Sequence, residues 1–149
     1  MQLTRFTDLG LRTMMLLAAG DAAERRITTR TIASGANASE HHVAKAVSKL
    51  SELGMVHARR GRVGGLVLTD AGRNASIGWL VRELEGDREV IECGGDSPCP
   101  LIAACRLRRV LADAKEAFYR ELDRYTVTDL TADNRLPIVL QLTTEGNLR

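Results

Sequence analysis

The sequence predicts a mainly α-helical protein: a winged helix-turn-helix with a small β-hairpin wing and a long C-terminal dimerisation helix. Three observations support this fold class. Aromatic residues make up only 3% of the 149 residues, and alanine and leucine are abundant, as in helical proteins. Two helical segments in the first half are followed directly by a glycine-rich hairpin pattern. Near the C-terminus, apolar residues then recur at helical spacing over about five turns.

The first predicted helix covers residues 4–19, with Thr4 as a possible N-cap. Its apolar residues cover more than one face, which predicts that the helix is buried. Asp8 and Arg12 lie four residues apart and therefore share a face, where a surface ion pair is the simplest interpretation. A linker over residues 20–26 follows this helix.

The next two helices are predicted to form a helix-turn-helix. The first begins near Thr29 and ends before Gly35, and the second covers residues 40–53, with Ser39 as its N-cap and Gly54 after its end. The second helix has an apolar inner face and a polar, partly basic outer face. This pattern is typical of a recognition helix that enters the major groove of DNA, although taken alone it also fits an ordinary solvated helix face.

Two strand-like runs, residues 55–60 and 66–68, enclose a glycine-rich turn with arginines near its tip. A basic hairpin directly after a helix-turn-helix is typical of a wing, whose glycines allow close approach to the sugar-phosphate backbone. The turn lacks the Lys-Ser/Thr pair of a P-loop and the strand-helix frame of a dinucleotide fold. The predicted DNA-binding residues are Ser39, His41, His42, Lys45, Ser48, Lys49, Arg59, Arg60, Arg62, Gly64 and Gly65.

The charge differs between the two halves of the chain. Residues 1–73 carry eleven lysines and arginines against six acidic residues, whereas residues 74–149 carry ten against thirteen. A basic head and a separate acidic region are what a nucleic-acid-binding module with a control region would show. A further helix is predicted over residues 75–85, ending at Gly86.

All three cysteines, Cys93, Cys99 and Cys105, lie on one Gly/Pro-rich loop, with five residues between neighbours. Thiolates gathered in this way favour zinc or iron-sulfur iron, and zinc sites usually use cysteine pairs that are closer together. We therefore expect an iron-sulfur cluster, in first place 4Fe-4S, with 2Fe-2S as the alternative after oxygen exposure. Three buried small side chains, or a thiol redox pair with one bystander, are the other interpretations.

Three cysteines leave one ligand position open, because such a cluster usually has about four. The candidate donors are Asp8, Glu85, Asp96 and solvent, since all three histidines lie in the DNA-binding half. Asp96 lies between two cysteines, where a further contact to the same cluster is awkward, and Glu85 precedes a glycine break. Asp8 lies on a rigid helix, with Arg12 one turn away to orient its carboxylate.

From Leu101 onward the pattern becomes helical, which places Cys105 in the first turns of a helix. The apolar stripe of this helix predicts a dimer contact, with packing against its own winged module as the alternative. A short helical start is predicted at residues 128–130, followed by a tail that frays. The stripe consists of Leu107, Val110, Leu111, Ala114, Phe118, Leu122 and Tyr125.

Four segments carry a family resemblance: residues 4–12, the helix-turn-helix through residue 56, the wing at 60–65 and the Cys-x5-Cys-x5-Cys loop. Together they resemble the dimeric winged-helix regulators that carry an iron-sulfur cluster, over residues 1 to about 130. Within this family the chain is most similar to the nitric-oxide-sensing transcriptional repressors of actinobacterial type.

The resemblance implies a homodimer that binds a palindromic operator in double-stranded DNA. It also implies that cluster nitrosylation releases the DNA and derepresses nitric-oxide detoxification genes, and it makes ligation by Asp8 of the partner subunit plausible. The family's regulator of cluster assembly has a histidine three residues after its third cysteine, where this chain has Arg108. That relative is disfavoured, whereas an iron- or redox-responsive regulator of the same family remains an alternative. A zinc-stabilised DNA-binding protein without sensing is the other.

Two further classes are disfavoured. The chain shows no paired carboxylates, nucleophile elbow or HExxH motif in a suitable frame, so we do not expect an enzyme. No stretch approaches the roughly 18 apolar residues of a membrane span, so we expect a cytoplasmic protein without a membrane partner. The expected organisation is a DNA-binding domain at residues 1–75, a cluster-binding loop and dimerisation helices at 76–130, and a tail at 131–149.

Overall fold

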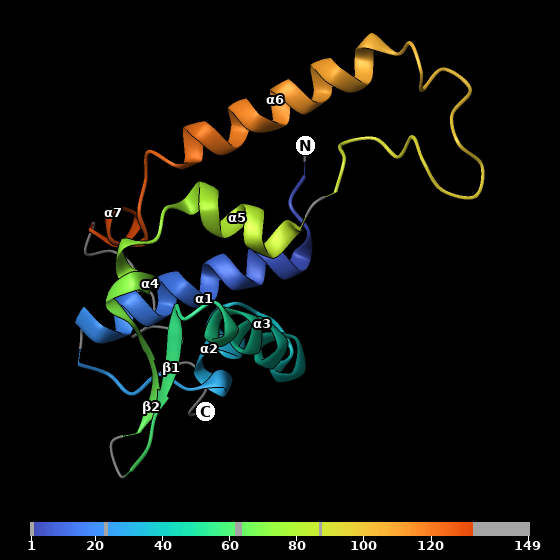
Figure 1. Ribbon diagram of the computed structural model, residues 1–149. Helices are drawn as coiled ribbons and strands as arrows, with labels where there is room; N and C mark the ends of the chain where they lie inside the picture. The colour runs from blue at the N-terminus through green and yellow to red at the C-terminus, as the bar shows by residue number, and fades with distance from the viewer. Residues whose placement is uncertain (1, 23, 62–63, 87, 133–149) are drawn as a thin grey trace.

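The computed structural model describes residues 2–22, 24–61, 64–86 and 88–132 (Figure 1). Within these ranges the chain forms seven helices and one two-stranded antiparallel sheet. The elements are α1 (Arg5–Ala22), α2 (Thr29–Gly35), α3 (Glu40–Glu52), β1 (Val56–Arg59), β2 (Gly65–Leu68), α4 (Asp70–Asn74), α5 (Ile77–Glu85), α6 (Arg106–Leu122) and α7 (Val127–Thr131).

Helix α1 is central to the core and packs against α3, α5 and α7. It begins as predicted, because the backbone nitrogen of Thr7 donates to the Thr4 hydroxyl at 3.2 Å and so satisfies one of the free N–H groups of the first turn. Met14 and Leu17 are fully buried. Burying a side chain of this size contributes about 1.5–3 kcal/mol, so the buried face of α1 is a main source of stability.

The helix-turn-helix consists of α2 and α3, and its predicted caps are confirmed. The backbone nitrogen of His42 donates to the Ser39 hydroxyl, and Gly54 has a φ of +75° just after the end of α3. Only glycine adopts this left-handed conformation without strain. The inner face of α3 is buried through Val43, Ala46 and Leu50, so the opposite face remains exposed.

The hairpin β1–β2 directly follows α3, as predicted. Arg59 lies opposite Gly65 in the register, and Val56 lies opposite Leu68, where both side chains are buried. The backbone nitrogen of Leu66 also donates to the carbonyl of Ile27 at 2.8 Å, so the linker between α1 and α2 is fixed to β2.

A short helix, α4, was not predicted from the sequence. Its five residues include a glycine and an asparagine, both poor helix formers. The hydroxyl of Thr69 accepts from the backbone nitrogen of Gly72, and a Cβ at Gly72 would clash with the Met55 carbonyl. Tertiary contact with the start of the hairpin therefore fixes a turn that local propensity alone does not specify.

Helix α6 runs along α5 only in its C-terminal half, where Tyr119 is buried and Phe118 and Leu122 pack on the core (Figure 1). Its N-terminal half extends beyond the body, so Leu107 and Val110 are 58% and 60% exposed. Packing on its own module thus covers part of the predicted apolar stripe and leaves the rest exposed.

Helix α6 also begins later than predicted. Leu101 to Ala104 form turns, in which the nitrogen of Ile102 donates to the carbonyl of Cys99 at 3.1 Å. Cys105 is the N-cap of α6 and therefore lies just before the first turn, and the predicted helical pattern from Leu101 is wrong. Tyr125 lies beyond the last residue of α6, whereas the helical start predicted near residue 128 is confirmed as α7.

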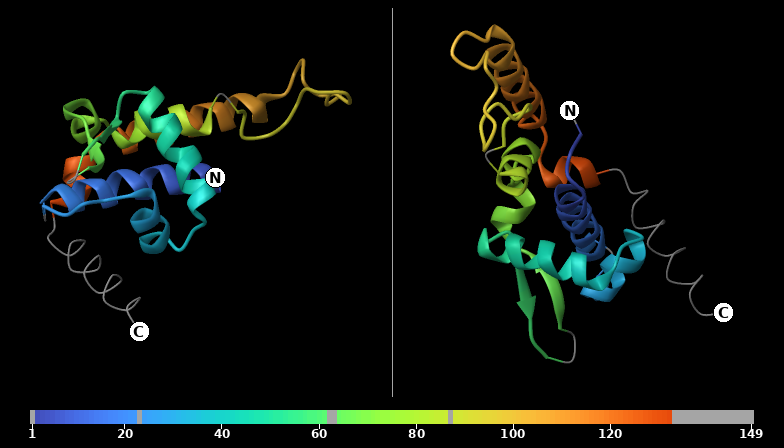
Figure 2. Two further views of the ribbon diagram at one scale, coloured as in Figure 1. Left: turned by 90° about the horizontal axis from the view of Figure 1, so that it is seen from below. Right: turned by 90° about the vertical axis from the view of Figure 1, so that its right-hand side faces the viewer.

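The hairpin and the loop that carries the cysteines lie at opposite ends of the subunit (Figures 1 and 2). Between these two ends lie α1 and α5, which pack against each other. No helix in the described ranges is both long enough and apolar enough to cross a membrane.

Candidate nucleic-acid interface and metal centre

The outer face of α3 presents the polar residues expected of a recognition helix. His41, Lys45 and Ser48 are exposed, and Lys49 is half-buried. Ser39 and His42 lie at the N-terminus of the helix, where the Ser39 hydroxyl and His42 Nδ1 are 2.8 Å apart. These side chains form one polar surface on the outer side of α3.

The hairpin carries the second predicted group. Arg59 and Arg60 are exposed, Gly65 is half-buried and Gly64 is buried, where a Cβ would clash with the Arg59 carbonyl. The close turn therefore requires glycine at residue 64. Arg62 lies outside the described residues.

The three cysteines lie on one loop between α5 and α6. Cys93 is only 5% exposed, and Cys99 and Cys105 are half-buried. The backbone nitrogen of Cys99 donates to the carbonyl of Cys93 at 3.0 Å, which closes residues 93–99 into a ring, and Gly95 has a φ of +100° within it. Within the described part of the single chain, no three His, Cys, Asp or Glu side chains converge tightly enough to hold a metal ion.

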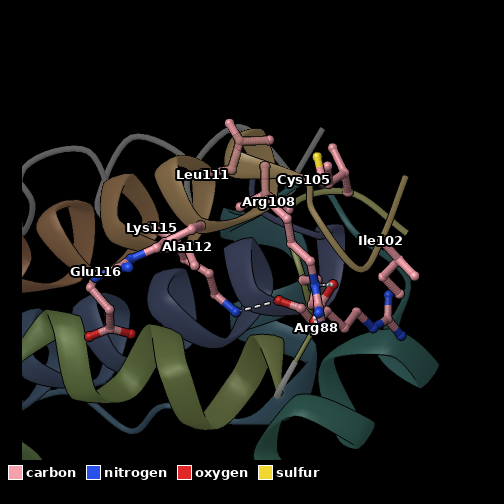
Figure 3. Close-up of a pocket in the computed structure, with 12 residues that line it drawn as sticks. Arg88, Ile102, Cys105, Arg108, Leu111, Ala112, Lys115 and Glu116 are labelled. Carbon is pink, nitrogen blue, oxygen red and sulfur yellow. Dashed lines mark hydrogen bonds and ion pairs between the residues drawn. The ribbon is translucent and has the colours of Figure 1, made fainter. Parts of the chain in front are cut away.

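Two pockets adjoin this loop, with volumes of about 450 and 540 Å³. Cys105 lines the first and Cys93 lines the second. In Figure 3, Cys105 and Arg108 extend from the start of α6 over the first pocket. The residues that line both pockets are Arg88, Glu89, Ile102 and Arg108.

The donor chemistry of the loop fits a thiolate-bound metal group. Soft thiolates are the ligands that iron-sulfur clusters take, and all three thiols are free. Cys105 makes no side-chain hydrogen bond to the first turn of α6, so the free N–H groups and the positive end of the helix dipole favour an anion there. The set is incomplete, however, because within the described residues of one subunit the three thiols do not converge with one another or with a fourth donor.

Arg108 lies beside the cysteines, and the sequence alone did not assign this arginine to the site. Arg108 forms a two-pronged ion pair with Glu89, and its hydrogen bond to Glu89 lowers the pKa of that carboxyl. Burial raises the pKa of the Cys93 thiol, as do the nearby Cys99 and Glu89, whereas Arg108 acts in the opposite direction. The signal in the sequence was the position of Arg108, one helical turn after Cys105.

Asp8 and Arg12 form the predicted ion pair, with Arg12 Nε and Asp8 Oδ1 2.7 Å apart on α1. Asp8 does not join the cysteines within one subunit. Glu85, another candidate donor, is already engaged: its Oε1 accepts from the backbone nitrogen of Thr4 at 2.6 Å and from the Thr4 hydroxyl at 3.0 Å. Asp96 is exposed on the loop between two cysteines.

Comparison with known proteins identifies the family. Residues 3–133 match the model of the Rrf2 family, described as iron-dependent transcriptional regulators. The chain belongs to the Rrf2 family. It is 56% identical over 143 residues to the HTH-type transcriptional repressor NsrR of Streptomyces coelicolor, which covers 96% of this chain and 97% of that protein. It is 41% identical over 135 residues to the HTH-type transcriptional regulator NsrR of Geobacillus kaustophilus, with 89% and 91% covered.

Among solved structures, the Rrf2 chain is similar to CymR, the global cysteine regulator of B. subtilis. The TM-score is 0.63 at 29% identity, with 89% of this chain and 97% of that chain covered. These comparisons confirm the predicted winged-helix fold class, the resemblance to NsrR, and a DNA-binding transcriptional repressor rather than an enzyme. The iron dependence of the Rrf2 family agrees with the expected use of iron.

A polar cluster that joins α5 to α6 in this Rrf2 chain was also missed from the sequence. Arg82 pairs with Glu116 and Asp123, each at 3.0 Å, and its guanidinium lies 4.6 Å from the centre of the Tyr119 ring. The Ser76 hydroxyl donates to Asp123 at 2.6 Å. The partners of Arg82 are 34 and 41 residues away in sequence, so no local pattern pointed to them.

Proposed function

We propose that this chain is an iron-sulfur-dependent repressor that senses nitric oxide. A homodimer binds a palindromic operator in double-stranded DNA, and exposure to nitric oxide releases it, which derepresses genes for nitric-oxide detoxification. The observation that carries this proposal is the loop itself: all three cysteines of the chain lie on the one loop between α5 and α6, with Cys93 buried. The resemblance to NsrR supports the nature of the signal.

In this proposal Cys93, Cys99 and Cys105 hold a cluster, which we expect to be 4Fe-4S. When bound, the cluster supplies iron that reacts with nitric oxide. Residues around the cysteines position and stabilise the thiolates that would bind the cluster. The ring closed by the Cys99 nitrogen and the Cys93 carbonyl brings two ligands into one turn. The N-terminus of α6 supplies positive charge, which offsets part of the charge of three thiolates. Arg108 lies beside them, but its charge is paired with Glu89.

The fourth ligand in this proposal is Asp8 of the partner subunit. The geometry of one subunit disfavours the other two carboxylates, because Glu85 is engaged with Thr4 and Asp96 lies between two ligands on a short loop. Asp8 has its carboxylate oriented by Arg12 and is partly exposed on α1, so a second subunit can reach it. A carboxylate oxygen is a weaker ligand for cluster iron than a thiolate, which makes this position the exchangeable one.

The homodimer is supported by the exposed start of α6. Leu107 and Val110 are more than half exposed, as is Leu101 on the preceding turn. A patch of this kind on a projecting helix is typical of an interface with another subunit. In the proposed division of the chain, residues 76–130 provide the cluster site and the dimer contact, and residues 1–75 bind DNA.

DNA recognition in this proposal uses α3 and the hairpin. His41, Lys45 and Ser48 lie on the exposed side of α3, opposite the buried Val43 and Ala46, so they can enter a major groove without disturbing the core. Arg59 and Arg60 of the hairpin contact the backbone or the minor groove. The remaining predicted contacts are Ser39, His42, Lys49, Arg62, Gly64 and Gly65.

The second candidate function is an iron-responsive regulator of the same family, which the description of the Rrf2 family as iron-dependent favours. Both functions use the same cysteines and the same DNA surface. They differ in the event that removes the protein from DNA: loss of iron in one case and exposure to nitric oxide in the other.

The experiment that tests the proposal begins with anaerobic purification of the full chain, followed by measurement of iron, acid-labile sulfide and operator affinity. We expect a brown protein that binds its operator with high affinity, and colourless Cys93→Ser, Cys99→Ser and Cys105→Ser variants that do not. Ser97→Ala, at an exposed position of the cysteine loop, is the control and should retain both properties. A colourless parent protein that contains zinc would contradict the proposal, as would cluster-free protein that binds the operator as tightly as loaded protein.

A further inference from the structure

We propose that the linker between α1 and α2 forms an additional contact with double-stranded DNA, in which Arg26 and Arg59 bind a phosphate group at the base of the hairpin. This inference rests on the proposed DNA-binding function. It adds a surface away from the outer face of α3 and from the tip of the hairpin.

The linker is held against the hairpin by backbone contacts. The nitrogen of Leu66 donates to the Ile27 carbonyl at 2.8 Å, so the linker contacts β2 at this point. A Cβ at Gly65 would lie 2.7 Å from the Ile27 oxygen and 3.3 Å from Cγ of Arg26. The absence of a side chain at Gly65 is therefore what allows the Arg26 stem to lie on the strand.

Arg26 and Arg59 both lie next to Gly65 of the hairpin. Arg59 lies opposite Gly65 in the register of β1 and β2, and Arg26 lies on Gly65 from the linker side. Both line one pocket of about 360 Å³ between the linker and the hairpin. This pocket is wide enough for a phosphate group, and guanidinium groups bind phosphate through paired hydrogen bonds.

The charges at this place are not neutralised. Arg26 and Arg59 are both exposed, and within the described part of the chain neither guanidinium forms an ion pair or a hydrogen bond. Of the two acidic residues that line the pocket, Asp21 is paired with Arg73 at 2.7 Å. Glu24 is the other. The site therefore keeps positive charge that an anion can use.

The position of the linker fits duplex DNA better than a small anion. The linker ends at Thr28, the N-cap of α2, and the first helix of a helix-turn-helix crosses the DNA backbone. The hairpin on its other side is a wing, which also contacts the backbone. Arg26 thus lies between two elements that both approach phosphates, and Arg59 precedes the exposed Arg60 of the turn.

The test measures the salt dependence of binding for Arg26→Ala, Arg59→Ala and the double variant, with two labelled duplexes. One duplex is selected from a random pool by the parent protein, and the other has an unrelated sequence. Each lost phosphate contact should lower the slope of log affinity against log salt by about 0.9. Because phosphates are common to all DNA, the slope should fall on both duplexes. Arg26→Lys, which keeps the charge, should restore most of the slope.

Arg120→Ala is the matched control, because it removes the same charge from an exposed position of α6, away from the hairpin. Its slope should equal that of the parent. Thermal melting should be unchanged in all variants, since the substituted side chains are exposed. Parent-like slopes for Arg26→Ala and Arg59→Ala would overturn this inference and leave the proposed function intact. A decrease of the slope on the selected duplex alone would indicate a base contact instead of a phosphate contact, and would also overturn this inference. A parent protein that selects no duplex from the pool and does not bind the unrelated duplex would overturn both this inference and the proposed function.

Discussion

The carboxylate of Glu85 accepts two hydrogen bonds from Thr4, one from its backbone nitrogen at 2.6 Å and one from its hydroxyl at 3.0 Å. These residues lie 81 positions apart. Glu85 is the last residue of α5, directly before the segment that leads to the cysteines, and Thr4 is the N-cap of α1. The start of the cysteine-bearing segment is therefore tied to α1, the helix that packs against α3 of the helix-turn-helix.

Replacing Glu85 by Ala should lower the free energy of unfolding by about 1–3 kcal/mol, because a partly buried N–H and hydroxyl lose a charged acceptor. Denaturant unfolding of the cluster-free protein measures this effect. Glu83→Ala is the control, since Glu83 is exposed on the same helix and a change there should stay within about 0.5 kcal/mol. Iron content should be unchanged in Glu85→Ala, and a variant that fails to load iron would make Glu85 a ligand instead.

Asp8→Ala should retain a cluster on three cysteines but shift its absorbance spectrum, weaken operator binding and alter the first step of the reaction with nitric oxide. The physical reason is that a carboxylate from the partner subunit both completes the iron coordination and joins the two subunits. Asp96→Ala is the control on the loop and should match the parent. If Asp8→Ala also matches the parent in all three measurements, another residue or water is the ligand.

Arg62→Ala should weaken binding to every DNA sequence and lower the salt slope by about one unit, because a phosphate contact carries no sequence information. Lys45→Ala, on the outer face of α3, should instead reduce affinity for the operator more than for unrelated DNA. Fluorescence anisotropy at several salt concentrations measures both. An unchanged slope for Arg62→Ala would remove this arginine from the set of phosphate contacts.

The environment of Asp123 should make the stability of the folded protein depend on pH. Hydrogen bonds from Ser76 and then from Arg82 lower the pKa of its carboxyl, although burial opposes them. A carboxyl whose pKa is lower in the folded state stabilises the protein above its unfolded pKa of about 3.9, and this contribution is lost as the pH falls below that value. Asp123→Asn should therefore lower the melting temperature at pH 7 and show a smaller further loss between about pH 4 and pH 2.

The control for this effect is Asp113→Asn, because Asp113 is exposed on α6, the helix that ends just before Asp123, and makes no hydrogen bond or ion pair with the described residues. Its melting curves should follow those of the parent at every pH. If Asp123→Asn keeps the full acid sensitivity of the parent, other carboxyl groups account for it.

Much of the DNA-binding module could be predicted from the sequence because its signals are local. Ser39 caps α3 through the nitrogen three residues later, and Gly54 ends it by adopting a positive φ. The hairpin follows from two short strands around glycines. Helix α4 could not be predicted in this way, because its glycine is required by the close approach of the Met55 carbonyl, which lies outside α4.

The cysteine loop shows more clearly which features could not be predicted from the sequence. Its spacing predicts the ligands, and the ring from Cys93 to Cys99 has a local cause in Gly95. The surroundings of the ligands depend on residues far along the chain, as with Arg108 and Glu89, 19 positions apart. A helix from Leu101 was predicted because apolar spacing was the only local signal, yet turns occupy that segment up to Cys105.

An anaerobic titration of the cluster-loaded protein with nitric oxide tests the role of the cluster most directly, with cluster absorbance and operator binding recorded on the same sample. We predict that the loss of the cluster spectrum and the release of DNA follow the same ratio of nitric oxide to cluster, and that the Cys93→Ser protein shows neither change. Full loss of the cluster spectrum while the DNA stays bound would contradict the claim that the cluster is the switch. Release by an iron chelator but not by nitric oxide would favour the iron-responsive function.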